Sequence, residues 1–292
     1  MTKLSQKLTG SDFLITSELT PPKGTDLKGL LDKAESLRDQ VTAFNLTESH
    51  AARMSMDPVA VAHLMLDRDC EPIVQMTSRD KNRIAIQASM LGAAALGVGN
   101  IVFMGGDSPK NGDHPDAKPV FDLYASQLLE AALSLRSGKD LAGNELHGTP
   151  QLTVGAVFNP GAGDVSAEID NIRRKEDGGA EFFQTQAIFD VPAFESFIEK
   201  ACPKKPVLAG VIPIKSVKMA LYMNEKVPGI DIPADIIKKI EAAGDDKEQI
   251  AAISVEVAAH TIRELRPIAR GIHIMAIGWE HYIPSIINKS EA

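Results

Sequence analysis

Short apolar runs alternate with amphipathic stretches along the whole chain. Eight runs rich in β-branched and aromatic residues predict strands at residues 13–19, 43–47, 72–77, 100–104, 151–158, 182–188, 206–213 and 271–277. Between them, apolar residues recur three or four positions apart. This spacing predicts helices over residues 28–40, 84–95, 120–137, 170–178, 233–243 and 250–265.

The alternation of strands and helices determines how the strands pair. Consecutive strands separated by helices run parallel, because a parallel connection needs a crossover of a dozen or more residues. Eight such units close into a (β/α)₈ TIM barrel, and a doubly wound open sheet is the competing architecture. No linker, charge block or low-complexity tract divides the 292 residues. We therefore expect an α/β protein with a single domain over residues 1–292.

Composition narrows the class of protein. The formal net charge is -8 without a basic cluster, which argues against nucleic-acid binding. Cys70 and Cys202 are too few for a cysteine-ligated cluster or a disulfide framework, and the seven histidines show no metal-ligand spacing, so no metal site is expected. No run reaches about 18 apolar residues and the N-terminus lacks a signal-peptide pattern. We therefore expect a cytoplasmic protein that binds no membrane.

The active site of a barrel forms at the C-terminal ends of its strands. Glu18 ends the first predicted strand, before a rigid Pro21-Pro22 turn. We expect apolar neighbours to raise its pKa toward neutrality, which suits a general acid, although a loop-capping role is equally open. Ser78 and Asp80 follow the third predicted strand, and their favoured interpretation is as caps of the next helix.

Other strand ends carry further polar candidates. A glycine pair ending in Gly106 precedes Asp107 and permits close approach of a ligand to the backbone, but it forms no dinucleotide fingerprint. Gln184 and Gln186 share one face of the sixth strand, where amides can bind a heterocycle or be buried against backbone. Lys215 follows the seventh strand, so a Schiff-base lyase is a second functional hypothesis and a non-catalytic scaffold barrel a third.

Six segments at these strand ends resemble the methylenetetrahydrofolate reductase family. They read Glu-Leu-x-Pro-Pro, Thr-Ser-Arg-Asp-x-Asn, Gly-Gly-Asp, Tyr-Ala-Ser, Arg-Lys-x-Asp-x-Gly-Ala and Gln-x-x-Phe-Asp, at residues 18–22, 77–82, 105–107, 124–126, 174–180 and 186–190. Each is weak alone, but together they span nearly the whole chain in order, as in single-domain bacterial reductases. The resemblance implies a barrel that binds FAD and reduces 5,10-methylenetetrahydrofolate to 5-methyltetrahydrofolate, in one-carbon metabolism and methionine biosynthesis.

The resemblance also implies roles for individual residues. Glu18 matches the family's general acid, which helps open the methylene bridge to an iminium that accepts hydride from flavin N5. Asp107 matches a carboxylate beside flavin N1 and the folate pterin, and Gln186 matches an amide that contacts folate. The cofactor-binding positions implied in the same way are Ser55, Gln75, Thr77, Gly106, Asp107, Tyr124, Ala125, Glu168 and Lys175.

Three positions depart from the family pattern. Gln75 stands where many relatives have histidine, and Gly105 replaces an arginine found in some of them. Val217 replaces an aromatic residue that packs against the nicotinamide cofactor or folate in well-known bacterial enzymes. The electron donor is therefore open between NADH, NADPH and a partner protein that feeds this chain as the flavin subunit of a larger complex. The resemblance implies FAD, but the altered contacts leave the choice between FAD and FMN open, and the physiological direction of the reaction is open too. Barrels of this kind commonly form homo-oligomers.

Overall fold

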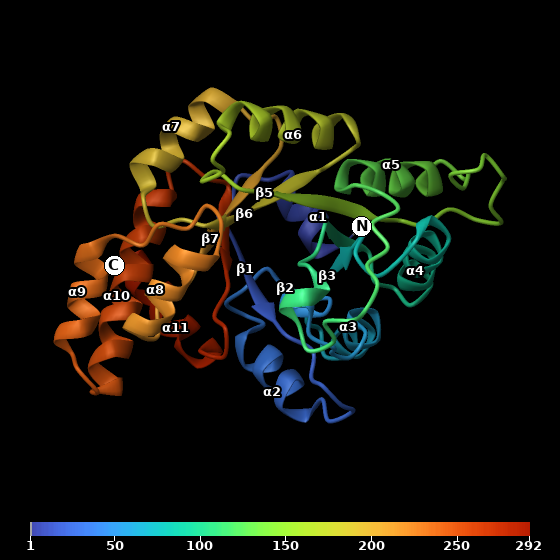
Figure 1. The fold of residues 1–292 in the computed structure, drawn as a ribbon. Coiled ribbons are helices and arrows are strands. Elements are labelled where there is room, and N and C mark those ends of the chain that lie inside the picture. The colour runs from blue at the N-terminus through green and yellow to red at the C-terminus, as the bar shows by residue number, and fades with distance from the viewer. Residues whose placement is uncertain (1) are drawn as a thin grey trace.

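The computed structural model describes residues 2–292, and its eight strands form a closed barrel (Figure 1). The strands are β1 (Leu14–Leu19), β2 (Ala43–Leu46), β3 (Pro72–Thr77), β4 (Asn100–Met104), β5 (Thr153–Phe158), β6 (Phe182–Ala187), β7 (Val207–Val211) and β8 (Gly271–Ile274). Each strand pairs in parallel with the next in sequence, and β8 closes the barrel on β1 with Leu14 opposite Gly271. The predicted (β/α)₈ architecture is confirmed.

Helices surround the strands on the outside of the barrel (Figure 1). They are α1 (Lys3–Leu8), α2 (Lys28–Leu37), α3 (Pro58–Leu66), α4 (Arg83–Ala95), α5 (Ala125–Arg136), α6 (Val165–Asp177), α7 (Val191–Ala201), α8 (Val217–Lys226), α9 (Ala234–Ala242), α10 (Lys247–Leu265) and α11 (Ile283–Glu291). Single 3₁₀ turns are η1 (His50–Ala52), η2 (Pro109–Asn111) and η3 (Glu280–Tyr282). Within residues 2–292 no helix combines the length and the apolar character that crossing a bilayer requires.

The helix predicted over residues 120–137 begins only at Ala125. The preceding segment runs beside the end of β3, because the backbone N–H groups of Val120 and Phe121 donate to the carbonyl oxygens of Arg79 and Ser78 at 2.7 and 3.0 Å. These long-range bonds, together with the positive φ of 43° at Phe121, keep the segment out of a helix.

The interpretation of Ser78 and Asp80 as helix caps is wrong. The N-cap of α4 is Asn82, whose side chain accepts hydrogen bonds from two backbone N–H groups of the first turn. Asp80 instead pairs with the guanidinium of Arg79, and the hydroxyl of Ser78 donates to a backbone carbonyl at the end of β4. The cap therefore lies two residues further along the chain than Asp80.

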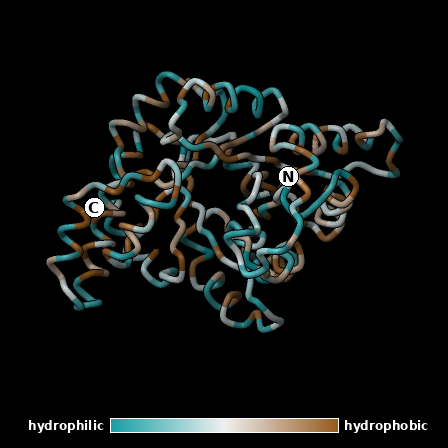
Figure 2. The backbone as a smooth tube through the Cα atoms, in the orientation of Figure 1, coloured by the Kyte–Doolittle hydropathy of each residue, from teal (hydrophilic) through white to brown (hydrophobic). Residues whose placement is uncertain are grey.

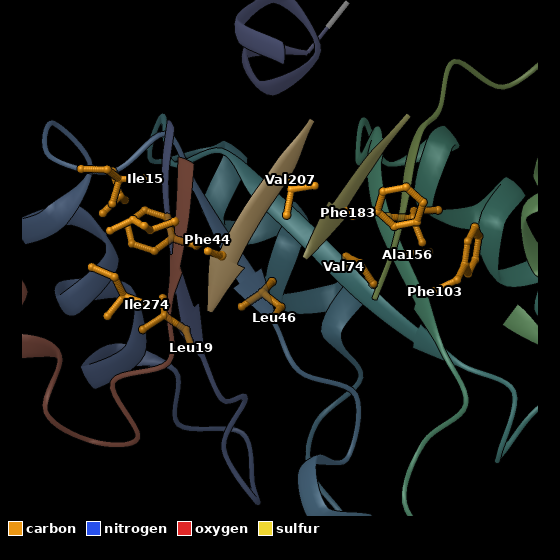
Figure 3. Packing of buried hydrophobic residues seen from close by; sticks show 14 of the residues in the cluster. Ile15, Leu19, Phe44, Leu46, Val74, Phe103, Ala156, Phe183, Val207 and Ile274 are labelled. Carbon is orange, nitrogen blue, oxygen red and sulfur yellow. The ribbon is translucent and has the colours of Figure 1, made fainter. Parts of the chain in front are cut away.

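The outer faces of the strands form the main core with the helices. Figure 3 shows Ile15, Phe44, Val74, Phe103 and Phe183 on this outer layer, and each is buried. Parallel strands covered on both sides read as nearly continuous apolar runs, which explains why all eight were recognisable in the sequence. The hydrophobic residues of the chain accordingly concentrate on the inside of the molecule, as the colouring of the backbone tube shows (Figure 2).

The side chains inside the barrel are apolar at the N-terminal ends of the strands and polar nearer the C-terminal ends. At the N-terminal ends of the strands the inward side chains are apolar, and Leu4 from α1 packs onto them; the layer comprises Leu14, Ala43, Ile73, Val102, Phe182 and Leu208. Gly155 makes room for this layer, because a Cβ there would lie 2.6 Å from the ring of Phe182. The next inward positions are polar, namely Thr16, Asn45 and Gln184, all buried. The polar layer supports the site described next.

Candidate functional site

A cavity of about 360 Å³ opens at the C-terminal ends of the strands. Its size falls within the range of small-molecule sites. Residues from six strands and from the adjoining loops and helices line it, including Glu18, His50, Gln75, Met104, Val157, Asn159, Glu168, Lys175, Gln184, Gln186, His273 and Met275. The cavity therefore brings together six of the residues named from the sequence as site candidates, which are Glu18, Gln75, Glu168, Lys175, Gln184 and Gln186.

Glu18 is the carboxyl group at the centre of this cavity. The Nε2 of Gln75 donates a hydrogen bond to Glu18 Oε2 at 3.2 Å, and the Nε2 of His273 lies 3.8 Å from the same oxygen. Burial raises the pKa of Glu18, but the nearby His273, the charge of His50 and the Gln75 amide together lower it below its ordinary value. The prediction of a raised pKa is thus wrong, because it considered burial without these partners.

A buried hydrogen-bond network extends below Glu18. Thr16 Oγ1 lies 3.0 Å from Nδ1 of His273 and donates to the carbonyl oxygen of Ile272 at 3.3 Å. Deeper in the barrel, Asn45 and Gln184 form a reciprocal amide pair with N···O distances of 2.7 and 3.0 Å. Gln184 Nε2 also approaches Thr16 Oγ1 at 3.5 Å. Buried amides and hydroxyls with several partners hold fixed orientations, so this network gives the cavity a rigid base.

Lys175 and Glu168 reach the cavity from α6. Lys175 Nζ donates to the carbonyl oxygen of Val157 at 2.6 Å, and burial lowers the pKa of this lysine to about 8. Glu168 Oε1 accepts the backbone N–H of Asn159 at 2.9 Å. A lysine and a carboxylate thus lie on the same wall, where they offer a donor and an acceptor to a bound molecule.

Thr77 lies beside the cavity, and its polar groups already form hydrogen bonds within the protein. Its backbone N–H and its hydroxyl both donate to Glu48 Oε2, at 2.6 and 2.8 Å, and Glu48 also pairs with Lys81. Glu48 is buried and was not singled out from the sequence. A carboxylate that directly follows a strand end in Thr47-Glu48 was the available signal.

Gly106 and Asp107 lie in the loop that follows β4, outside the cavity lining. Gly106 has φ +87°, and a Cβ there would come within 3.1 Å of Thr77 and Arg79, so local packing already requires glycine. Asp107 is exposed, and its backbone carbonyl accepts a hydrogen bond from Arg79 at 3.4 Å. Within residues 2–292 the Asp107 carboxylate has no hydrogen-bond partner.

The remaining predicted cofactor positions lie apart from this cavity. Tyr124 and Ala125 begin α5, and the Tyr124 side chain is 78% exposed. Ser55 lines a second hollow of about 640 Å³ together with Lys23 and Arg53, and His50 lines both hollows. The Oγ of Ser55 is buried without a hydrogen-bond partner in the described part of the chain.

His273 is the main site residue that sequence reasoning missed. The histidines show no metal-ligand spacing in the sequence, and no other role was expected for His273. The alternation of the last strand contained the signal, since His273 lies opposite Thr16 on the neighbouring strand, two residues before Glu18, and shares an inward face with Met275. Lys215, in contrast, bonds to the carbonyl of Ile277 and does not line the cavity.

A larger hollow of about 830 Å³ lies at the opposite end of the barrel. Its lining comes from the N-terminus and the first residues of strands, and its main charged pair, Arg136 and Glu181, is already bonded at 3.1 Å. Barrel active sites lie at the other end, so the smaller cavity around Glu18 is the stronger candidate. Within residues 2–292, no group of three or more His, Cys, Asp or Glu side chains has the arrangement of a metal site.

Comparison with known proteins shows the family to which the chain belongs. The family model described as methylenetetrahydrofolate reductase matches residues 3–291. The chain is 23% identical over 305 aligned positions to methylenetetrahydrofolate reductase 1 of Schizosaccharomyces pombe, covering 98% of this chain and 48% of that protein. It is 24% identical over 172 positions to 5,10-methylenetetrahydrofolate reductase of Escherichia coli, covering 58% of this chain and 52% of that protein. The chain thus spans about half the length of the curated relatives it matches.

Among solved structures, a Clostridium thermocellum protein described as binding two copies of 5-methyl-5,6,7,8-tetrahydrofolic acid is similar over 99% of this chain and 98% of its own. The TM-score is 0.65 at 17% sequence identity. At this identity the similarity concerns the fold, and it agrees with the closed eight-stranded barrel.

Proposed function

The chain belongs to the methylenetetrahydrofolate reductase family, and from that membership we propose that it reduces 5,10-methylenetetrahydrofolate to 5-methyltetrahydrofolate with FAD as cofactor. The observation that carries this proposal is the Glu18 carboxyl, held by Gln75 and His273 in a cavity that Gln186 also lines. The folate bound by the Clostridium thermocellum barrel supports the same class of ligand.

The residues around the cavity fit a large polar cofactor. Ser55 carries a buried hydroxyl without a partner, and its hollow adjoins the Glu18 cavity through His50. Lys23 and Arg53 give that second hollow basic side chains, which suit phosphate groups. We propose that Ser55, Gln75, Glu168 and Lys175 hold FAD, with Thr77, Gly106, Asp107, Tyr124 and Ala125 as further contacts implied by the family.

The side chains of the protein position the folate and deliver a proton to it. When bound, FAD supplies the hydride that reduces the bridging carbon of folate. Glu18 gives a proton to the folate nitrogen whose bond to that carbon breaks, and the electron pair of the bond stays on the nitrogen. Gln75 orients the carboxyl through its 3.2 Å hydrogen bond, and Gln186 binds the folate ring through its amide.

The general-acid role has a direct test. Replacing Glu18→Gln keeps the shape of the side chain and removes the exchangeable proton. We expect the folate half-reaction to slow by about 10² to 10⁴-fold, the usual contribution of a general acid. Reduction of the flavin by its donor should persist in the same preparation. Equal loss of both half-reactions would contradict the assignment.

The electron donor is proposed as NADH or NADPH, with a partner protein as the alternative. Val217 at the start of α8 lacks an aromatic ring that could stack on nicotinamide, and this favours the partner protein. Visible absorbance of the purified protein, followed by anaerobic addition of NADH and then NADPH, separates these cases. A flavin band that bleaches identifies the nucleotide, whereas a band that stays oxidised points to a partner protein.

A folate-binding barrel without redox chemistry is a second candidate function. The exposure of Asp107 and Tyr124, both outside the cavity, favours it because these residues are expected to contact the flavin. If this candidate holds, added FAD gives no bound flavin band while 5-methyltetrahydrofolate still binds. A retained flavin band with methylenetetrahydrofolate turnover rejects it.

A further inference from the structure

We propose that His273 is the immediate proton source for Glu18, and that Thr16 is the positioning residue that makes it so. The inference rests on the proposed function, because it concerns how Glu18 acquires the proton that it gives to folate. It assigns a role to two buried residues beneath the cavity. Its geometric basis is the chain of contacts from Ile272 through Thr16 and His273 to Glu18.

Thr16 determines which ring nitrogen of His273 carries hydrogen. In the proposed arrangement the single hydroxyl hydrogen of Thr16 is donated to the carbonyl oxygen of Ile272, 3.3 Å away, and the oxygen accepts from Nδ1 of His273, 3.0 Å away. This assigns the Nδ1–H tautomer to the neutral ring. The second nitrogen, Nε2, then presents a lone pair toward Glu18 when the ring is neutral and an N–H when it is charged.

Glu18 and His273 consequently share one proton. Either the ring is an imidazolium beside a carboxylate, or it is a neutral imidazole beside a carboxylic acid. The Nε2 to Oε2 separation of 3.8 Å is within ion-pair range, and the Glu18 side chain must move about 0.8 Å closer to form a hydrogen bond. Catalytic hydrogen bonds are commonly long before substrate binds.

The other ionisable groups of the cavity have different positions. Lys175 is bonded to the carbonyl of Val157, and Glu168 accepts a backbone N–H, so both face other partners. His50 adds positive charge near Glu18 without a hydrogen bond to it within residues 2–292. Among these ionisable groups, His273 is the one whose ring nitrogen is paired with the Glu18 carboxyl within residues 2–292, at 3.8 Å.

The proposed transfer is balanced in protons and electrons. The proton leaves Nε2 of His273 for Oε2 of Glu18, and from there it passes to the folate nitrogen whose bond to the bridging carbon breaks. That nitrogen keeps the bonding pair, Glu18 returns to a carboxylate, and the ring becomes neutral. Water at the cavity mouth recharges the ring after product leaves.

The first test is spectroscopic and needs no turnover. In the holoenzyme, ¹⁵N NMR of the histidine rings should assign His273 as the Nδ1–H tautomer when neutral. Replacing Glu18→Gln should shift the Nε2 resonance of His273, because the neighbouring carboxylate is lost. An Nε2–H tautomer, or an Nε2 resonance unmoved by Glu18→Gln, would overturn the proposal.

The second test is kinetic and separates proton supply from structure. Oxidation of the reduced holoenzyme by methylenetetrahydrofolate is followed against pH in wild type and His273→Asn. We expect the variant to be about 10²-fold slower near pH 7.5 and to approach wild type near pH 5, where Glu18 takes its proton directly from solvent. A merely structural role would slow the reaction equally at every pH, which would refute the proposal.

Thr16 provides the matched pair of variants. Thr16→Ser keeps the hydroxyl and should retain the wild-type pH profile, whereas Thr16→Val removes the acceptor for Nδ1–H and should move the profile toward that of His273→Asn. Identical profiles for the two variants would reject the positioning role. A wild-type holoenzyme that folate fails to oxidise at any pH refutes the proposed function, while the NMR test still decides the tautomer and the shared proton.

Discussion

The reciprocal amide pair of Asn45 and Gln184 makes a measurable prediction about stability. Both side chains are buried, and two hydrogen bonds of 2.7 and 3.0 Å join them. Replacing Asn45→Leu removes both bonds and leaves the Gln184 amide without its main partner. An unsatisfied buried polar group costs about 1–3 kcal/mol, and a lost hydrogen bond about 1 kcal/mol. We therefore expect each of Asn45→Leu and Gln184→Met to lower the free energy of unfolding by about 2–4 kcal/mol.

The double variant distinguishes hydrogen bonding from packing. Asn45→Leu with Gln184→Met replaces both amides by apolar groups of similar size, so no unsatisfied amide remains. The double variant should recover at least about 2 kcal/mol relative to the sum of the two single losses. Urea unfolding followed by circular dichroism and by fluorescence of Trp279 measures this, provided that the two transitions coincide. Additive losses would refute the interpretation of the pair as a coupled unit.

Two further predictions concern single positions. Because burial lowers the pKa of Lys175 to about 8 while the unfolded chain retains about 10.4, the unfolded state binds more protons between these values and stability should rise with pH across that window. Lys175→Met should flatten this rise in urea titrations from pH 7.5 to 10.5, and an unchanged slope would contradict the burial argument. Gly271→Ala should lower stability by about 3 kcal/mol or more, since its Cβ would lie 2.2 Å from the carbonyl oxygen of Leu14; a thermal midpoint within about 1 °C of wild type would contradict it.

The fold was predictable because the strands are covered on both faces. A continuous apolar run such as Val207–Val211 predicts a buried strand, and all five residues of that strand are buried. Helix α3 was not predicted, because its sequence PVAVAHLML is apolar on nearly every side and gives no periodic signal. The limits of α5 were missed because hydrogen bonds to distant residues keep the preceding segment out of the helix.

The site was predictable only in part. The position of Glu18 at a strand end predicted that it would line the cavity at the barrel mouth, since the carboxyl ends of all strands meet there. The direction of its pKa shift was not predictable, because the deciding partner, His273, comes from the opposite end of the chain. β8 pairs with β1 only because the sheet closes into a barrel. The residues close to Glu18 in the sequence give no sign of this pairing.

Because side chains fill the N-terminal end of the barrel, its interior opens to solvent at the C-terminal end. Below the amide pair the space is filled by apolar side chains and by Leu4 from α1, so the cavity around Glu18 communicates with solvent only at its mouth. Molecules that react at this carboxyl therefore enter and leave through the same mouth. If the electron donor and folate occupy that mouth in turn, initial-rate plots at several fixed donor concentrations should be parallel lines.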